Sequence, residues 1–402
     1  MQPANYNTAC PKQGMARKRT RVLVGMSGGV DSSVAAALLV EQGYEVIGVT
    51  IKTYNYEDVG GNLGNESSCC SLEGINDARR VCLLLGIPHL VVDFTEPFRE
   101  QIIEDFVEEY FRGRTPNPCV RCNRAIKWGE LLRKADALGA DYIATGHYAR
   151  LVFDAEQGRY RLLRGRDPHK DQSYALWMLP QQFLARTLFP LGELTKEQVR
   201  REAQRLGLPI AHKPESFELC FVPDNDYRRF VRQFAPERAE RLRGGVILRD
   251  GRPIGRHEGY PFYTIGQRRG LGISAPEPLY VLEILPQENA LVVGPEQQLY
   301  HRGLCAREVN LIAFEALPPE GLRCTAKIRY KDEGAPATAW QDAEGRLWVL
   351  FDTPRRAITP GQSVVLYEGE ELIGGGVIES WCDEMPFPAV QEELQGACEV
   401  HS

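Results

Sequence analysis

The stretch that decides the fold is Arg21–Ser33, which reads RVLVGMSGGVDSS. Its first part, Val22–Val24, is a short apolar run of the kind that forms a buried parallel strand. The glycines that follow allow a tight turn close to a ligand, and Asp31-Ser32-Ser33 is typical of the start of a helix. A strand, a glycine turn and a helix start together present backbone N–H groups and a positive dipole end to an anion. We therefore predict an anion-binding loop here.

This loop is not the common P-loop, because that pattern needs a Lys before its last Ser or Thr, and Val30-Asp31 occupies that place. SGGVDSS instead resembles the pyrophosphatase loop of ATP-dependent adenylating enzymes, in which the released anion is pyrophosphate. A glycine-rich turn alone is weak support for nucleotide binding. The full motif after a hydrophobic strand makes a purely structural turn the poorer interpretation.

Strands alternate with helices after this loop. We expect strands over 45–52, 89–94 and 141–145, and helices over 34–43, 74–85, 98–111 and 123–138. This alternation predicts a parallel sheet that is covered on both faces and binds ligands beyond the carboxyl ends of its strands. The loop, the segment after Ile51 and the Gly146-His147 pair should therefore surround one crevice.

The pattern changes from about Tyr227. Two short basic helices precede a Gly-rich segment and alternating strands through Gly294, and five or more short β runs follow between Leu299 and Ser380. These signals predict a small central domain and a C-terminal antiparallel barrel. The expected boundaries are a flexible leader at 1–20, a catalytic domain at 21–226, the central domain at 227–296, the barrel at 297–384 and an acidic tail at 385–402.

The composition is that of an ordinary soluble protein of two or three domains, with 43% hydrophobic and 25% charged residues in a chain of 402. There is no apolar run of about 18 residues, so we expect no membrane span and a cytoplasmic location. A net charge of −6 argues against a uniformly basic nucleic-acid binder. Residues 196–256 nevertheless carry 14 Lys or Arg against 9 Asp or Glu, which suits phosphate contacts and equally a solvated helix face.

The eleven cysteines are better interpreted as thiols, metal ligands or catalytic groups than as a disulfide framework. Cys119 and Cys122 form a CxxC pair just before a predicted helix, whose dipole favours thiolates. Cys122 is therefore a plausible nucleophile, although redox, metal and incidental roles also suit the pair. Cys220 on its own would be interpreted as a core residue. The others are expected in strands (Cys305, Cys324, Cys382), in a loop over the nucleotide at 55–71 (Cys69, Cys70) and at the ends (Cys10, Cys398).

Seven motifs occur in this order along the chain: SGGVDSS, NPCVRCN, ATGHYAR, KDQSYAL, SFELCF, YTIGQRRGLG and TPGQSVV. Together, from about Arg21 to Asp383, they closely resemble the tRNA-specific 2-thiouridylases. The resemblance implies an α/β fold with an adenine-nucleotide α-hydrolase-like (pyrophosphatase-loop) domain, a small central domain and a C-terminal antiparallel β-barrel. It implies an enzyme that uses ATP and Mg²⁺ to adenylate the 2-oxygen of the wobble uridine, position 34 of tRNA, and then replaces it with sulfur. The sulfur would arrive as a persulfide from a carrier protein fed by a cysteine desulfurase.

The resemblance also implies site residues. Cys122 would be the nucleophile and Cys220 the persulfide carrier, with a disulfide between them as by-product. ATP would be bound by Gly25, Met26, Ser27, Gly28, Gly29, Val30, Asp31, Ser32, Ile51 and Gly146. Asn117, Pro118 and Cys119 would flank the target base, and tRNA contacts would come from His147, Lys170, Asp171, Gln172, Arg329, Tyr330 and Gln362. For His147, a structural histidine is the other interpretation. Charge and position add Arg228, Arg229, Arg232, Arg268 and Arg269 as candidate phosphate contacts.

One departure from the family pattern is Cys119, because many members carry Asp at that position. A cysteine there can serve as a thiolate base, or Cys119, Cys122 and Cys220 can together hold a [4Fe-4S] cluster with one open iron. Two other functions stay open. A small-molecule adenylating synthetase would explain the loop but not the placed cysteines, and a non-catalytic RNA-binding module with a structural metal would explain the thiols but not the loop.

Overall fold

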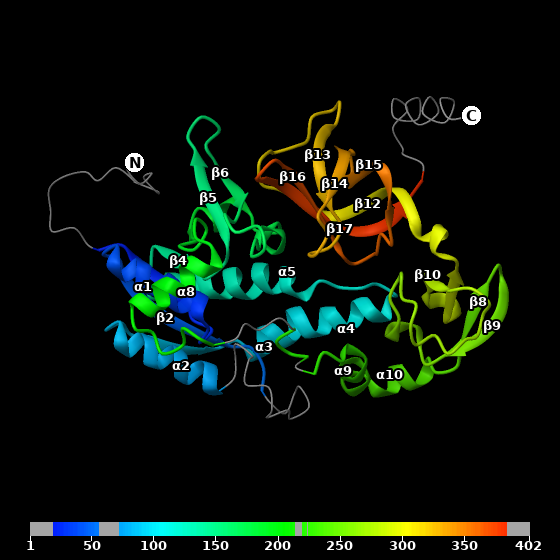
Figure 1. Ribbon diagram of the computed structural model, residues 1–402, viewed down its shortest axis with the longest axis horizontal. Coiled ribbons are helices and arrows are strands. Elements are labelled where there is room, and N and C mark those ends of the chain that lie inside the picture. Colours follow the sequence, from blue (N-terminus) through cyan, green and yellow to red (C-terminus); the bar gives the residue numbers. More distant parts are fainter. Residues whose placement is uncertain (1–18, 56–71, 214–218, 223, 384–402) are drawn as a thin grey trace. The chain divides into compact units, whose positions relative to one another are not determined.

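The computed structural model describes residues 19–55, 72–213, 219–222 and 224–383. The predicted leader up to residue 18, the loop over 56–71 with Cys69 and Cys70, and the acidic tail lie outside these residues, as do Cys10 and Cys398. The chain packs as two compact units (Figure 1). Unit 1 draws on Met1–Ile102, Cys119–Asp226 and Glu370–Leu372, and unit 2 on Ile103–Pro118, Tyr227–Gly369 and Ile373–Ser402.

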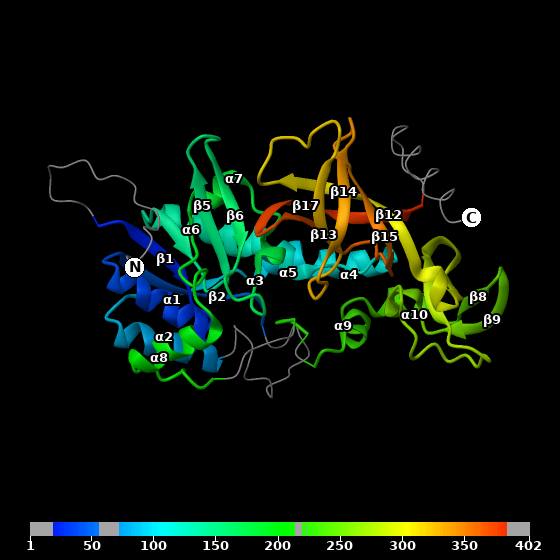
Figure 2. The same cartoon turned by 45° about the horizontal axis from the view of Figure 1, so that its top comes forward.

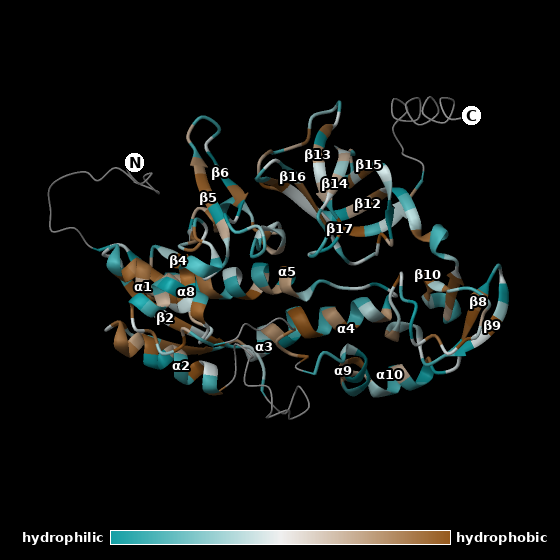
Figure 3. Ribbon diagram, in the orientation of Figure 1, coloured by the Kyte–Doolittle hydropathy of each residue, from teal (hydrophilic) through white to brown (hydrophobic). Residues whose placement is uncertain are grey.

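Unit 1 is built on a parallel sheet with the strand order β3-β2-β1-β4-β7. Val22–Val24 of the central strand are fully buried, as expected of a parallel strand covered on both faces, and Figure 3 shows the hydrophobic character of β2 beside it. The predicted parallel-sheet fold is therefore confirmed. The strands are β1 (Arg21–Gly25), β2 (Glu45–Lys52), β3 (His89–Asp93), β4 (Tyr142–Ala144) and β7 (Thr187–Leu188).

Helices α1 (Val30–Glu41) and α8 (Lys196–Arg205) pack together on this sheet. Val34 and Val199, one from each helix, belong to the same buried cluster as the residues of β1. The long helices predicted over 98–111 and 123–138 each contain a π-helical segment. The first consists of α3 (Thr95–Phe98), η2 (Arg99–Ile103) and α4 (Glu104–Phe111). The second consists of α5 (Pro118–Cys122), η3 (Asn123–Glu130) and α6 (Leu131–Ala137). The remaining helix before β3 is α2 (Leu72–Leu84).

Our sequence analysis did not predict the elements between β4 and residue 226. A hairpin of β5 (Ala149–Asp154) and β6 (Arg159–Arg164) follows β4, and β6 pairs with Glu371 and Leu372 at the start of β17 (Glu371–Cys382). Short helices η4 (Ser173–Leu176) and α7 (Gln181–Leu184) come next. Within the described residues, no helix is long and apolar enough to cross a membrane.

Unit 2 contains the predicted central sheet and barrel (Figures 1 and 2). The central sheet has the order β10-β11-β8-β9, and the barrel order β12-β15-β14-β13-β16-β17 is closed by pairing of β12 with β17. The prediction of a closed antiparallel barrel is thus confirmed. Its strands are β12 (Tyr300–Leu311), β13 (Leu322–Lys327), β14 (Ala335–Gln341), β15 (Leu347–Arg356) and β16 (Ser363–Glu368); the central strands are β8 (Gly245–Arg249), β9 (Arg252–His257), β10 (Tyr280–Leu285) and β11 (Ala290–Gly294).

Helix α4 packs inside unit 2 with α9 (Tyr227–Phe234), which α10 (Pro236–Arg241) follows. The rings of Tyr110 and Tyr227 stack with centroids 4.6 Å apart. The hydroxyl of Tyr260 donates to the carbonyl of Phe111 at 2.6 Å. Aromatic packing and this buried hydrogen bond therefore fix the helix that leads into the NPCVRCN motif.

Candidate active site

The glycine loop after β1 is built by close backbone approach. Gly28 has φ +73°, and a Cβ there would lie 2.2 Å from the carbonyl oxygen of Gly74. A Cβ on Gly146, just past β4, would lie 2.7 Å from the amide nitrogen of Ser32. Only glycine fits at either position without a shift of the surrounding backbone. The structure thus brings the end of β4 against the start of α1, as the strand-end rule predicted.

The first turn of α1 has no side-chain cap. Its N-cap residue is Gly29, and the serine hydroxyls stabilise the loop instead: Ser33 Oγ donates to Gly29 O at 2.8 Å, and Ser32 Oγ accepts from the amide of Ser27 at 3.1 Å. A helix start without a side-chain cap leaves N–H groups and the positive dipole end for an anion. This is the geometry that a phosphate-binding loop requires.

The residues predicted to bind ATP gather at the carboxyl edge of the sheet. The amide of Met26 donates to Val49 O at 2.8 Å, and Thr50 Oγ1 donates to Met26 O at 2.9 Å, so the loop is tied to the end of β2 that contains Ile51. Gly146 closes the other side, as described above. This edge collects Gly25, Met26, Ser27, Gly28, Gly29, Val30, Asp31, Ser32, Ile51 and Gly146, whose contacts with ATP stay a prediction.

Asp31 is the centre of an ionic network that sequence analysis missed. Lys196 Nζ donates to its two carboxylate oxygens at 2.7 and 2.9 Å, and the Tyr148 hydroxyl donates to Oδ1 at 2.7 Å. The capping box of Thr195 and Gln198 starts α8 at Lys196 and so directs this lysine to the loop. The T-x-x-Q pattern at Thr195–Gln198 predicts the helix start, but no local pattern predicts that Lys196 pairs with Asp31.

The two cysteines of the CxxC pair lie inside a helix rather than before it. We predicted a helix start at Asn123, which is wrong: α5 begins at Pro118, because proline is well suited to the first helical position. Cys119 is exposed and Cys122 is half-buried. The next residue, Asn123, is buried and donates Nδ2 to Ala175 O at 2.9 Å, which anchors the helix behind Cys122.

Cys220 lies in the short described segment 219–222, within unit 1 like Cys122. It is half-buried and therefore not the core residue that its sequence context alone suggested. Its neighbour Phe221 is buried against Phe98, with ring centroids 5.8 Å apart in an edge-to-face arrangement. Phe221 thus fixes the segment in unit 1, and Cys220 beside it is half-buried.

The predicted iron–sulfur ligands are not part of a candidate metal-ion site among the described residues. Across residues 19–55, 72–213, 219–222 and 224–383, no three His, Cys, Asp or Glu side chains group closely enough to hold a metal ion. Cys119, Cys122 and Cys220 all fall within these ranges. An iron–sulfur cluster on these three thiols stays a prediction.

His147 is buried, with 9% of its surface exposed. Its Nδ1 lies 2.8 Å from Thr145 Oγ1, and its ring packs against Trp128 with centroids 5.6 Å apart. Burial lowers the pKa of His147 well below its ordinary value, so the imidazole is neutral. These contacts match the structural interpretation, and a contact with tRNA stays a prediction.

Asp171 and Gln172 build the loop beside His147. The Asp171 carboxylate accepts from the amides of Gly165 and Ser173, each at 3.0 Å, and Gln172 Oε1 accepts from the Tyr148 amide at 3.0 Å. Two of the predicted tRNA contacts therefore also order the backbone. Lys170, next to them, is half-buried.

The predicted tRNA contacts of unit 2 differ in exposure. Arg329 and Tyr330 are exposed, and Arg329 donates to the carbonyls of Arg356 and Ala357 at 2.9 and 3.0 Å. Gln362 instead donates Nε2 to the backbone of the segment before the CxxC pair. Asn117 in that segment is half-buried, and Pro118 is buried.

The arginines proposed from charge alone are placed on and near α9. The guanidinium of Arg232 lies 4.4 Å from the ring centre of Phe262 and 3.6 Å from Glu258 Oε2. Arg228 lies 5.8 Å from the ring centre of Tyr263, and Arg229 bonds to Gln233. Arg268 and Arg269 are exposed.

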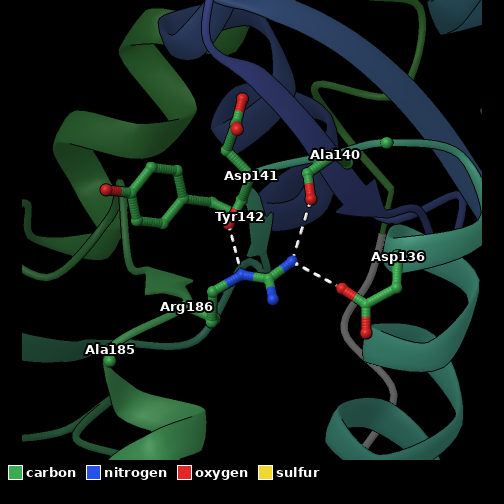
Figure 4. A pocket seen from close by; sticks show the side chains of 7 residues that line it. Asp136, Ala140, Asp141, Tyr142, Ala185 and Arg186 are labelled. Atoms are coloured by element: carbon green, nitrogen blue, oxygen red, sulfur yellow. Dashed lines mark hydrogen bonds and ion pairs between the residues drawn. The ribbon is translucent and has the colours of Figure 1, made fainter.

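A surface depression in unit 1 lies at the opposite edge of the sheet from the loop. It is lined by residues that precede β4 and β7, and Figure 4 shows the Arg186 guanidinium held by the carbonyls of Ala140 and Asp141 and by the Asp136 carboxylate. Ligands in parallel sheets bind at the carboxyl ends of the strands. We therefore assign this depression a structural role.

Comparison with known proteins identifies the family. The chain matches the tRNA methyl transferase HUP domain over residues 20–224, the tRNA methyl transferase PRC-barrel domain over 228–295 and the aminomethyltransferase beta-barrel domain over 301–378. A tRNA-specific 2-thiouridylase MnmA from Salinibacter ruber is 53% identical over 90% of this chain and 94% of that protein. Proteins of the same name from Pelotomaculum thermopropionicum and Carboxydothermus hydrogenoformans are 52% and 51% identical, over 91% and 90% of this chain and 99% and 98% of theirs. Identity of this degree over nearly the whole length shows that the chain belongs to the tRNA-specific 2-thiouridylase family.

Proposed function

We propose that this protein is a tRNA-uridine 2-sulfurtransferase, which uses ATP to replace the 2-oxygen of the wobble uridine of tRNA with sulfur and releases AMP and pyrophosphate. The observation that carries the proposal is the glycine loop at the uncapped start of α1, in the same compact unit as Cys122 and Cys220. A small-molecule adenylating enzyme would need the loop but not the two cysteines. Membership of the 2-thiouridylase family supports the choice of tRNA.

The first step is adenylation. The uridine 2-oxygen attacks the α-phosphorus of Mg–ATP, the bond to the β-phosphate breaks, and pyrophosphate leaves. The N–H groups at the start of α1 stabilise the departing negative charge, and Lys196 neutralises the Asp31 carboxylate beside the loop, so that this carboxylate does not repel the phosphates. Linking the oxygen to AMP turns a poor leaving group into a good one.

The second step transfers sulfur. A persulfide on Cys220 attacks C2 with its outer sulfur and AMP leaves, while the Cys122 thiolate attacks Cys220 Sγ and breaks the S–S bond. In the other order, Cys122 attacks the persulfide first and releases sulfide, which then attacks C2. Either order oxidises the two cysteines to a Cys122–Cys220 disulfide, which an external dithiol must reduce before the next turnover.

Cys119 takes the position that Asp holds in many family members. Its exposure and its place in the first turn of α5 suit a thiolate that accepts a proton beside the target base. We adopt the free-thiol mechanism, because Cys122 and Cys220 alone account for the sulfur transfer and for its disulfide by-product. Iron and acid-labile sulfide at about one cluster per chain in active, anaerobically purified protein would reverse this choice.

The partners follow from the chemistry. Unit 2 supplies the exposed Arg329, Tyr330, Arg268 and Arg269 for contacts with tRNA. A persulfide carrier fed by a cysteine desulfurase supplies the sulfur, and these reactants place the protein in the cytoplasm. The domain boundaries that we propose are 21–226, 227–296 and 297–384, and the three family matches support them.

Pyrophosphate release tests the adenylation step. We expect release from ATP to require tRNA that lacks the modification, and to persist for about one turnover in Cys122→Ser, because adenylation precedes sulfur transfer. Release at the full rate without RNA would instead indicate a small-molecule acceptor. No nucleotide turnover combined with tight tRNA binding would indicate a non-catalytic RNA-binding module.

A further inference from the structure

The segment that leads into the CxxC pair is held by a turn of the C-terminal barrel. Both lie in unit 2. The amide of Thr115 donates to Pro360 O at 2.9 Å, and Gln362 Nε2 donates to Thr115 O at 3.0 Å and to Pro116 O at 3.2 Å. We call residues 360–362 the barrel turn. Three hydrogen bonds therefore connect this turn to two successive residues of the segment.

The barrel turn lies so close to the segment that its middle residue must be glycine. Gly361 has φ +91°, and a Cβ there would lie 2.8 Å from Thr115 O and 3.0 Å from the Cβ of Arg114. L-residues rarely adopt this φ, and backbone carbonyls cannot retreat as a flexible side chain can. Both the conformation and the contact exclude a larger residue.

The barrel itself fixes the turn. The amide of Gly361 donates to Ile378 O at 2.8 Å, and the amide of Ile378 donates to Gln362 O at 2.8 Å. Ile378 belongs to β17 and is fully buried in the barrel core. The hydrogen bonds to the segment therefore start from a rigid support.

The segment has few means of ordering itself. Pro116 and Pro118 have no N–H to donate, and the segment forms no helix until Pro118. Its upstream end is fixed, because the Arg114 amide donates to Glu109 O at 2.9 Å at the end of α4. The remaining backbone groups of Thr115 and Pro116 depend on the barrel turn.

We infer that the barrel turn positions Asn117 and Pro118, which we propose to flank the target base, with Gln362 as a positioning residue. This inference rests on the proposed function. It assigns both N–H groups of the Gln362 amide to the protein backbone, whereas our sequence analysis assigned the side chain to tRNA. Displacement of a reacting group by about 1 Å can cost about 100-fold in rate, so a small loosening of the turn should lower the rate of the reaction.

Two variants disrupt this support in different ways. Gly361→Ala inserts the excluded Cβ, and Gln362→Met keeps the length of the side chain but removes its donors. Gly345→Ala is the matched control, because Gly345 has φ +79° in the same barrel and a Cβ there meets nothing within 4 Å. Amide hydrogen exchange of a peptide covering residues 112–118 measures directly how firmly the segment before the CxxC pair is held. The exchange of β1 reports whether each variant remains folded.

We expect exchange of the 112–118 peptide to rise at least ten-fold in Gly361→Ala and Gln362→Met but not in Gly345→Ala. We expect kcat for 2-thiouridine formation to fall about ten-fold or more, with the Kd for tRNA within two-fold of wild type. Unchanged exchange would overturn the inference, as would weaker tRNA binding at unchanged kcat, which would make Gln362 a tRNA contact. If the wild type forms no 2-thiouridine, the proposed function fails, while the exchange measurement still decides whether the turn holds the segment. Should Gly361→Ala fail to fold, Gln362→Met alone decides.

Discussion

At the scale of single residues, the folded state disfavours the protonated form of His147. It is neutral in the folded protein because burial against Trp128 and Phe189 lowers its pKa well below the ordinary value. An unfolded chain protonates its histidines near pH 6.5. Below that pH the unfolded state binds a proton that the folded state does not, so stability falls as the pH falls toward the lowered native pKa.

We expect His147→Gln to lose part of this pH dependence. One proton of difference is worth about 1.4 kcal/mol per pH unit, so between pH 6.5 and 5.5 the wild type should lose about 1 kcal/mol more than the variant. Urea unfolding at the two pH values measures this. The pKa values of His89 and His257 are also lowered by burial, so the variant should keep a weaker dependence of the same sign. Equal losses in wild type and variant would contradict the assignment.

At the scale of elements, the contact between α1 and α8 carries the network at the nucleotide loop. Lys196 is only 12% exposed in its side chain and pairs with Asp31 at one end of the two helices, whereas Arg205 pairs with Glu41 at the other. In Lys196→Met the Asp31 carboxylate loses its cation at the loop where we propose that the phosphates of ATP bind. A hydrogen bond to a charged group is worth about 1.5–3 kcal/mol, so we expect the KM for ATP to rise about ten-fold or more.

The matched control for this prediction is Arg205→Met, which breaks an ion pair between the same two helices away from the loop. We expect it to leave the KM for ATP within two-fold of wild type. Steady-state kinetics at saturating tRNA measures both variants. Equal increases in KM would mean that Lys196 acts only through helix packing.

Helix α9 provides a second prediction at this scale. Arg228 and Arg229 are consecutive, half-buried residues of α9. We expect replacement of both by Ala to weaken tRNA binding and to make log Kd less dependent on salt, by about one unit of slope for each phosphate no longer bound. Arg241→Ala on α10 is the control, because this arginine is 78% exposed in its side chain and pairs with Glu237 of the same helix. Affinity measured from low to high salt decides; an unchanged slope would assign the two arginines to solvent.

Local patterns predicted the elements that local chemistry determines. We could predict β1, the glycine loop and most barrel strands, because buried strands have a recognisable hydrophobic pattern and turns have typical residues. Strand β14 was not, since its sequence APATAWQ is rich in Ala and Pro. The pairing of Asp31 with Lys196 spans 165 residues, and the contact of Gln362 with Thr115 spans 247, so only the folded chain brings these partners together.

The candidate site was predictable to a similar degree. The nucleotide loop follows from its motif, but the burial of His147 depends on Trp128 and Phe189, which come from other elements. The helix start at Pro118 places the CxxC pair inside α5, which no periodicity indicates in so short a helix. The motifs therefore predicted which residues form the candidate site, and only the structure shows the burial and the neighbours of each side chain.

At the scale of the whole molecule, the residues that we propose to be functional are distributed over the two compact units. Unit 1 contains the nucleotide loop, Cys122 and Cys220, and unit 2 contains the barrel turn, the segment before the CxxC pair and the exposed Arg329 and Tyr330. The proposed reaction needs both units in one chain. Activity should therefore depend on groups of unit 2, such as Gln362, as well as on the nucleotide loop of unit 1.

The most direct measurement of the central claim is nucleoside mass spectrometry of unmodified tRNA after incubation with the protein, Mg–ATP and a sulfide or persulfide source. We predict ATP-dependent 2-thiouridine from the wild type and, with a persulfide donor, none from Cys122→Ser. Cys220→Ser should retain product with sulfide if free sulfide can attack C2, and lose it with a persulfide donor. Thiouridine that forms equally in Cys122→Ser with a persulfide donor, or ATP cleavage to AMP with no thiouridine in any arm, would contradict the account.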